Sequence, residues 1–187
     1  MSKLYFITHP SVQIIKNQSI DQWGLSDKGI DETRGLLKLD FWNEINVVYS
    51  SPEKKAVQTA QLVSSECKLE ICLSDCLSEV DRSSTGFIDY DKYIEAIKNF
   101  YNRPDESIQG WESANNATKR ITECVKSIMS NHKDQTVAIV GHGATGTLLV
   151  CSLLNKKPDF TEDPQGTGRY MIINWDKRQI IQKWLTY

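Results

Sequence analysis

Short apolar runs alternate with helical patterns along most of the chain, and this alternation constrains the fold more than any other feature. Apolar runs typical of strands cover residues 3–8, 45–50, 69–74 and 135–141, and helical patterns cover residues 27–39, 52–65, 90–103, 113–131 and 143–154. Strands that alternate with helices predict an α/β sandwich around a largely parallel sheet. The final segment, GRYMIINWDKRQIIQKWL, predicts two strands joined by a turn at Asp176 and Lys177, which adds an antiparallel strand.

Three of the predicted helices begin with recognisable capping residues. Ser26 precedes Asp27 and can cap the first helix, and Ser113 can cap the helix that runs to about residue 131. In the segment SSPEKK, Ser51 is expected as the N-cap and Pro52 as the first helical residue.

Length and composition indicate an ordinary globular domain without a bulk charge signal. The chain has 187 residues, of which 40% are apolar and 25% charged, and its formal net charge is −2. This balance argues against nucleic acid or an anionic membrane as a partner. No apolar run approaches the ~20 residues of a membrane helix, and the start MSKLYFITHP does not have the form of a signal peptide.

The cysteine pattern shows neither a metal motif nor an evident disulfide framework. There are five cysteines, an odd number, and no Cys or His pair completes a zinc site of the usual spacing. We expect reduced thiols and a cytoplasmic location. The cysteines are Cys67, Cys72, Cys76, Cys124 and Cys151.

Two of the three histidines stand at the carboxyl ends of predicted strands. His9 follows the first strand, and His142 stands between Gly141 and Gly143 just before a helix. Ligands of open α/β sheets bind outside the carboxyl ends of the strands, and helix N-termini attract anions. The two strand ends and the helix starts in SSPEKK and GHGATG therefore predict a phosphate pocket.

Six segments, taken in order, resemble the motifs of the histidine phosphatases, the phosphoglycerate mutase-like superfamily. They are LYFITHP, GLSDKGIDETRGL, VVYSSPEKKAVQTAQLV, LSEVDRSSTG, GWESANNATKR and AIVGHGATGTLL, and together they extend over nearly the whole chain. The resemblance implies one domain over residues 1–187, folded as a three-layer α/β/α sandwich with a mostly parallel mixed sheet. It also implies a substrate-covering insertion at about residues 81–111.

The resemblance implies a role for each matching residue. His9 would be the nucleophile that forms a phosphohistidine, and His142 the second imidazole that binds the phosphoryl oxygens. Glu79 would be the general acid and then the general base. No metal or other cofactor is implied, because cationic side chains neutralise the phosphate charge. The chain is shorter than the mutases of the family, which favours a phosphatase over a mutase.

The sequence departs from the family pattern at the phosphate-binding positions. The family's first arginine is Thr8 here, its second arginine is Lys55, and the glycine after the nucleophile is Pro10. Lysine keeps the positive charge but loses the planar fork of arginine. Arg82, three residues after Glu79, is our candidate for the missing first arginine, and the alternative is a solvated loop arginine. Thr8, Lys55, Arg82 and Gly143 are therefore the predicted phosphate-binding residues.

Three functional hypotheses remain open at this point. The first is a phosphomonoesterase that acts on a small phosphorylated substrate, and the second is a non-catalytic relative that binds a phosphorylated ligand or partner. The loss of arginine at Thr8 favours the second, whereas the retained His9, His142 and Glu79 favour the first. A dinucleotide-binding protein is poorly supported: GHGATG has the bare Gly-x-Gly-x-x-Gly spacing, but it lies late in the chain and lacks the acidic partner.

Overall fold

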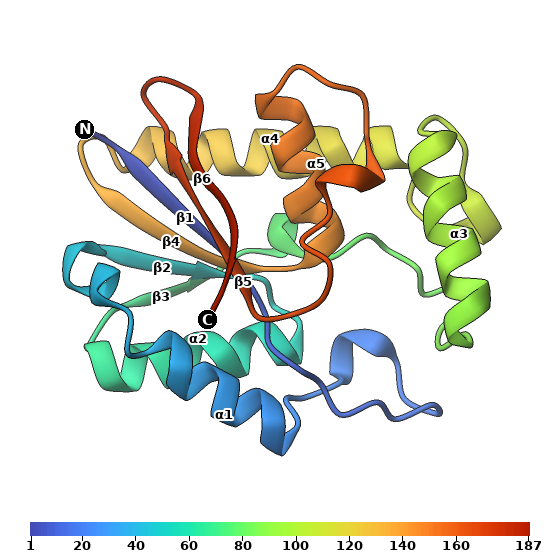
Figure 1. The fold of residues 1–187 in the computed structure, drawn as a ribbon, viewed down its shortest axis with the longest axis horizontal. Helices are drawn as coiled ribbons and strands as arrows, with labels where there is room; N and C mark the ends of the chain where they lie inside the picture. The colour runs from blue at the N-terminus through green and yellow to red at the C-terminus, as the bar shows by residue number, and fades with distance from the viewer.

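A computed structural model describes all residues from 1 to 187 as a six-stranded mixed sheet between helices (Figure 1). The strands are β1 (Lys3–Thr8), β2 (Val47–Ser50), β3 (Ile71–Leu73), β4 (Thr136–Gly141), β5 (Arg169–Asn174) and β6 (Gln179–Thr186). The α-helices are α1 (Asp27–Leu36), α2 (Lys54–Cys67), α3 (Tyr90–Asn102), α4 (Ala114–Asn131) and α5 (Gly143–Leu153). The predicted order of elements is confirmed.

The strand order is β3-β2-β4-β1-β5-β6, and the four strands from β3 to β1 run parallel. β5 is antiparallel to β1, and β6 is antiparallel to β5, which confirms the predicted terminal hairpin. The register pairs Thr8 at the end of β1 with Gly141 at the end of β4. Each histidine stands one residue beyond this pair, so the sheet itself brings His9 and His142 to the same edge.

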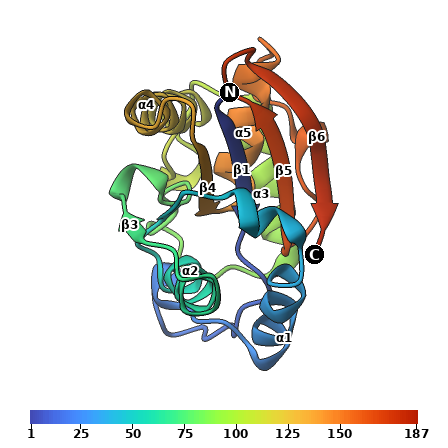
Figure 2. The same cartoon turned by 90° about the vertical axis from the view of Figure 1, so that its left-hand side faces the viewer.

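Helices cover both faces of the sheet and produce the predicted three layers. α1 and α2 lie on one face and α4 and α5 on the other, while α3 stands apart near one end (Figures 1 and 2). Successive side chains of β1 point to opposite faces. Leu4 and Phe6 therefore belong to the core under α4 and α5, and Tyr5 and Ile7 to the core under α1 and α2.

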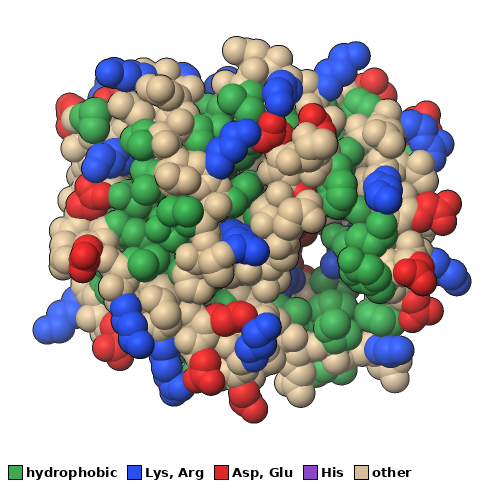
Figure 3. All heavy atoms as spheres, in the orientation of Figure 1, with side chains coloured by type: hydrophobic (Ala, Val, Ile, Leu, Met, Phe, Trp, Pro, Cys, Tyr) green, Lys and Arg blue, Asp and Glu red, His purple; other side chains and the backbone are tan.

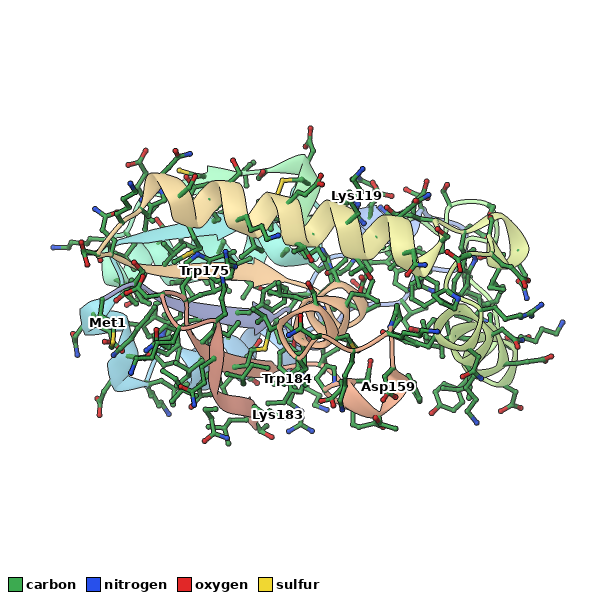
Figure 4. All side chains as sticks on the ribbon, turned by 90° about the horizontal axis from the view of Figure 1, so that it is seen from above. Met1, Lys119, Asp159, Trp175, Lys183 and Trp184 are labelled. Atoms are coloured by element: carbon green, nitrogen blue, oxygen red, sulfur yellow. A yellow bond between two sulfur atoms is a disulfide. The ribbon has the colours of Figure 1, made fainter.

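The C-terminal hairpin closes the sheet beside α5. Trp184 on β6 packs against α5 at Gly146, where an added Cβ atom would lie 2.8 Å from the indole (Figure 4). The hydroxyl of Tyr187 donates to the carbonyl oxygen of Thr8 at 2.7 Å, so the chain terminus braces the end of β1.

The start of α2 differs from the prediction. The helix begins at Lys54, and Glu53 has extended dihedral angles (φ −64°, ψ 136°), so Pro52 does not open the helix and Ser51 is not its N-cap. The Ser51 hydroxyl instead accepts the backbone N–H of Glu53 at 3.2 Å and contacts His142. Ser51 therefore belongs to a turn that contacts His142, and not to the expected helix cap.

The start of α1 fixes the segment that follows β1. Ser26 accepts the N–H of Gly29, as predicted for an N-cap, and both the backbone and the hydroxyl of Ser26 donate to the carbonyl of Ser11. A Cβ atom on Gly29 would lie 2.0 Å from that carbonyl oxygen, so only glycine permits this approach. The chain beyond His9 is thus anchored to α1.

The expectation of five reduced thiols was wrong for one pair. Cys76 and Cys124 form a disulfide with their Cα atoms 5.8 Å apart, which joins the short helix at Asp75–Leu77 to α4. The two cysteines are 48 residues apart in sequence, and only the packing of α4 against this segment brings them together. The cytoplasmic location rested on the reduced state and stays a prediction.

Candidate active site

All seven residues predicted for the site line one cavity of about 400 Å³ at the carboxyl ends of β1 and β4. They are Thr8, His9, Lys55, Glu79, Arg82, His142 and Gly143. The space-filling view shows the surface hollowed between the α3 side and the rest of the molecule, with hydrophobic side chains on the α3 side (Figure 3). The volume of the cavity lies within the range of small-molecule sites.

His9 is oriented by its own neighbour. Its Nδ1 lies 2.8 Å from the carbonyl oxygen of Pro10, and a carbonyl oxygen only accepts, so Nδ1 carries the ring hydrogen. The other ring nitrogen, Nε2, is then left with its lone pair. Burial, followed by the positive charge of Lys55, lowers the pKa of His9 to about 4, so the ring is neutral at pH 7.

His142 lies fully buried beside His9. The two rings meet edge to face with centroids 5.3 Å apart. Nε2 of His142 lies 2.8 Å from the Ser51 hydroxyl and 3.5 Å from Oε1 of Glu53, whereas Nδ1 has no partner. Burial lowers the pKa of His142 to about 3 despite the nearby carboxylate. The site therefore contains two neutral imidazoles.

Glu79 caps the helix that follows His142. Its Oε2 accepts the backbone N–H of Ala144 at 3.1 Å, and its Oε1 accepts those of Thr145 and Val80 at 3.0 Å each. Burial, together with the charge of Glu53, raises the pKa of Glu79, although the three N–H donors act in the opposite direction. Desolvation and a like charge outweigh the donors, so the protonated form of Glu79 is favoured more than in an ordinary glutamate.

Glu53 is a site residue that the sequence analysis missed. Its side chain, 11% exposed, forms an ion pair with the buried Lys55, and its Oε1 accepts the backbone N–H of Glu79 at 2.7 Å. Burial opposes its ionisation, but His142 and Lys55 lower the pKa of Glu53 to about 2. Lys55 also donates to the carbonyl oxygen of Ile20 at 3.0 Å. One of the two cavity cations is therefore already neutralised.

Arg82 is the cation of the cavity that pairs with no carboxylate. Its guanidinium lies 5.0 Å from the centre of the Tyr93 ring, in a cation–π contact that holds it at the cavity wall.

The Thr8 hydroxyl is occupied by the backbone of Arg169, since it accepts the N–H at 3.0 Å and donates to the carbonyl at 3.3 Å. A Cβ atom on Gly143 would approach only Pro164, at 3.7 Å.

The lining of the cavity is partly apolar. Residues of α3 supply much of the apolar part, within the segment 81–111 that the resemblance assigns to substrate covering. The apolar lining residues are Val12, Ile20, Trp23, Tyr90, Tyr93, Ile94, Ile97, Ala144, Phe160 and Pro164. A second cavity of about 490 Å³ adjoins it and shares Ile20, Glu79 and Arg82 with it.

Two further observations concern metals and membranes. No group of three or more His, Cys, Asp or Glu side chains is arranged to hold a metal ion. None of the helices combines the length and the hydropathy that crossing a bilayer demands.

The sequence offered only a weak signal for the two missed residues. The segment SSPEKK predicts Ser51 as a helix cap, and it gives Glu53 no role beyond its place after Pro52, because Ser-Pro-Glu is a common helix start. Lys55 in the first turn of the helix was the one indication, because the helix dipole disfavours a cation there and an acidic neighbour would offset its charge.

Comparison with known proteins identifies the family. The model of the histidine phosphatase superfamily (branch 1) matches residues 4–186. The chain belongs to this superfamily. Phosphoserine phosphatase 1 of Hydrogenobacter thermophilus is 25% identical over 190 residues, a match covering 97% of this chain and 90% of that relative.

Solved structures of the superfamily share the fold. Phosphoserine phosphatase from Entamoeba histolytica, in complex with 3-phosphoglyceric acid, superposes with a TM-score of 0.82 at 18% identity, over 100% of this chain and 98% of the other. The α-ribazole phosphatase from Shigella flexneri gives a TM-score of 0.78 at 18% identity, over 99% and 96% of the two chains. These neighbours confirm the predicted sandwich.

Proposed function

We propose that this protein is a phosphatase that hydrolyses a phosphomonoester through a phosphohistidine on His9. The observation that carries the proposal is the contact between His9 Nδ1 and the carbonyl of Pro10, which leaves Nε2 as an unprotonated nucleophile in a cavity shared with Glu79. A neutral imidazole with a fixed tautomer is what attack on phosphorus requires.

The first step transfers the phosphoryl group to the enzyme. His9 Nε2 forms a bond to phosphorus while the bond from phosphorus to the leaving oxygen breaks. Glu79 donates its proton to that oxygen, so the leaving group departs as an alcohol. The raised pKa of Glu79, caused by burial and by Glu53, supports this role.

The second step regenerates the enzyme. Glu79, now a carboxylate, takes a proton from a water molecule that attacks the phosphohistidine. The N–P bond breaks, inorganic phosphate leaves, and His9 is again neutral. His142, Lys55 and Arg82 would stabilise the charge on the transferring oxygens, so the mechanism needs no metal ion.

The apolar lining and the relatives bear on the substrate. The cavity is large enough for a small organic phosphate, and aromatic and aliphatic side chains of α3 form part of its lining. Phosphoserine phosphatases are among the relatives, which makes phosphoserine a first candidate. A mutase is disfavoured on the length argument alone.

The ion pair between Glu53 and Lys55 favours a second candidate function. Because the carboxylate neutralises one of two cavity cations, phosphate would meet a smaller positive charge than two free cations give. A relative that binds a phosphorylated ligand without turnover would tolerate this. The complete set of His9, His142 and Glu79 argues for the enzyme.

One experiment separates the two functions. Phosphate release is measured from p-nitrophenyl phosphate, phosphoserine and other phosphorylated metabolites, in the presence of EDTA. The phosphatase predicts release by the wild type and none by His9→Ala. Binding of phosphate without release from any substrate would instead establish the non-catalytic function.

A further inference from the structure

Glu53 contacts three groups of the proposed mechanism at once. Its Oε1 lies 2.7 Å from the backbone nitrogen of Glu79 and 3.5 Å from Nε2 of His142, and its Oε2 pairs with Lys55. A surface acid would not be built into such a set of contacts.

We infer that Glu53 is a positioning residue whose fixed negative charge disfavours ionisation of the neighbouring Glu79 and holds Lys55 in a neutralised pair until phosphate arrives. The inference rests on the proposed phosphatase function, which it deepens. Glu53 neither attacks phosphorus nor exchanges a proton with the substrate.

The first part of the inference follows from charge and from the backbone contact. Glu53 is an anion next to Glu79, and two carboxylates in one buried site disfavour a second negative charge. The hydrogen bond from the Glu79 backbone nitrogen fixes the distance between the two residues. The fixed anion therefore makes loss of the Glu79 proton less favourable.

Other charged and titratable groups surround Glu79 and do not replace this effect. Arg120 on α4 donates to the Glu79 backbone oxygen at 3.2 Å, but its charge is matched by Glu112 at 2.7 Å. The cationic Lys55 and Arg82 act in the opposite direction to Glu53. The remaining groups are His9, His142, Tyr93 and Tyr101, all neutral at pH 7, and Asp163, which lines the same cavity and whose pKa is raised by burial.

The second part follows from the buried ion pair. Lys55 is 4% exposed, and a buried ammonium without a counter-charge is costly. Glu53 supplies the counter-charge in the empty cavity, so a phosphate must compete with a resident carboxylate for Lys55. Removal of that carboxylate should tighten the binding of phosphate.

Glu53→Gln tests both parts, because the amide keeps the shape and removes the charge. We expect the alkaline limb of the kcat profile to move to lower pH by about one unit, and phosphate to bind about tenfold more tightly by titration calorimetry. Glu53→Asp keeps the charge and should retain the wild-type limb. The control Glu66→Gln, at an exposed position of α2, should change neither quantity.

A lower kcat in Glu53→Gln with both the alkaline limb and the phosphate affinity unchanged would overturn the inference and leave only a structural role. If Glu53→Gln does not fold, Glu53→Asp provides the test. An alkaline limb that lies one pH unit lower in Glu53→Asp than in the wild type would overturn the inference. If the wild type has no turnover, the proposed function fails, and the phosphate affinities alone decide whether Glu53 competes for Lys55.

Discussion

The Nδ1 atom of His9 lies 2.8 Å from the carbonyl oxygen of Pro10, and this contact between neighbours directs the lone pair of Nε2 away from the backbone. Proline lacks an N–H donor and has a fixed φ, which restricts the conformation of the preceding residue. The accepting carbonyl is a backbone group that every residue carries, so the change from glycine to Pro10 leaves this hydrogen bond available. Four predictions follow from the geometry around this residue and its supports, and a fifth concerns the reaction itself.

The acid limb of the activity profile should lie near pH 4. Burial lowers the pKa of His9 to about 4, and only the neutral ring can attack, so protonation stops the reaction only below that pH. Measurement of kcat/KM from pH 3.5 to 9 checks this. Half-maximal activity near pH 6.5, the ordinary value for histidine, would show that His9 is not held as described.

Arg82→Ala should weaken phosphate binding and kcat/KM by about ten- to a hundredfold, since a hydrogen bond to a charged group is worth about 1.5–3 kcal/mol. The phosphate affinity and kcat/KM of Arg82→Lys should lie between those of the wild type and those of Arg82→Ala. The matched control is Arg103→Ala, because Arg103 pairs with Glu106 on the surface. If Arg82→Ala binds phosphate as tightly as the wild type, Arg82 is a solvated loop residue and does not bind phosphate.

Loss of the Cys76–Cys124 disulfide should lower the free energy of unfolding by about 2–4 kcal/mol. The bridge ties the segment that leads to Glu79 to α4, so Cys124→Ser should also reduce kcat. Chemical denaturation with and without dithiothreitol measures the first effect. A count of three free thiols in the oxidised protein shows that the disulfide has formed. If that protein has the same free energy of unfolding with and without dithiothreitol, the prediction is wrong.

Gly29→Ala should destabilise the protein by about 1–3 kcal/mol, because the new Cβ atom would lie 2.0 Å from the carbonyl oxygen of Ser11. Gly35→Ala, on the same helix, meets no atom closer than 3.4 Å and should stabilise the helix slightly. Thermal unfolding of the two variants is the comparison. Similar melting temperatures would mean that the contact at Gly29 is relaxed at little cost.

Local sequence signals predicted the fold because they agreed with its tertiary structure. β1 was predicted to span residues 3–8 and does so, and the caps at Ser26 and Ser113 are as expected, because both depend only on neighbouring residues. The positions of His9 and His142 followed from the rule that parallel strands end at the same edge. The family resemblance contributed Glu79, Thr8 and Lys55, whereas Arg82 was proposed from its place three residues after Glu79.

Features that depend on distant contacts could not be predicted in this way. The helix α2 begins at Lys54 and not at Pro52, and Ser51 and Glu53 contact His142 and Lys55. The local Ser-Pro-Glu pattern does not distinguish this arrangement from an ordinary helix start. The disulfide likewise depends on α4 lying against a segment 48 residues away in sequence. The Thr8 hydroxyl is taken by β5, at the other end of the chain.

The central claim is the covalent intermediate on His9. Wild-type protein is mixed with a phosphorylated substrate and quenched within milliseconds at alkaline pH, where phosphohistidine survives, and the modified peptide is mapped by mass spectrometry. We predict one phosphoryl group on His9, none in His9→Ala, and a longer-lived phosphoenzyme in Glu79→Gln. Rapid turnover by the wild type without a phosphoryl group on His9 at any quench time, and turnover that persists in His9→Ala, would contradict the account.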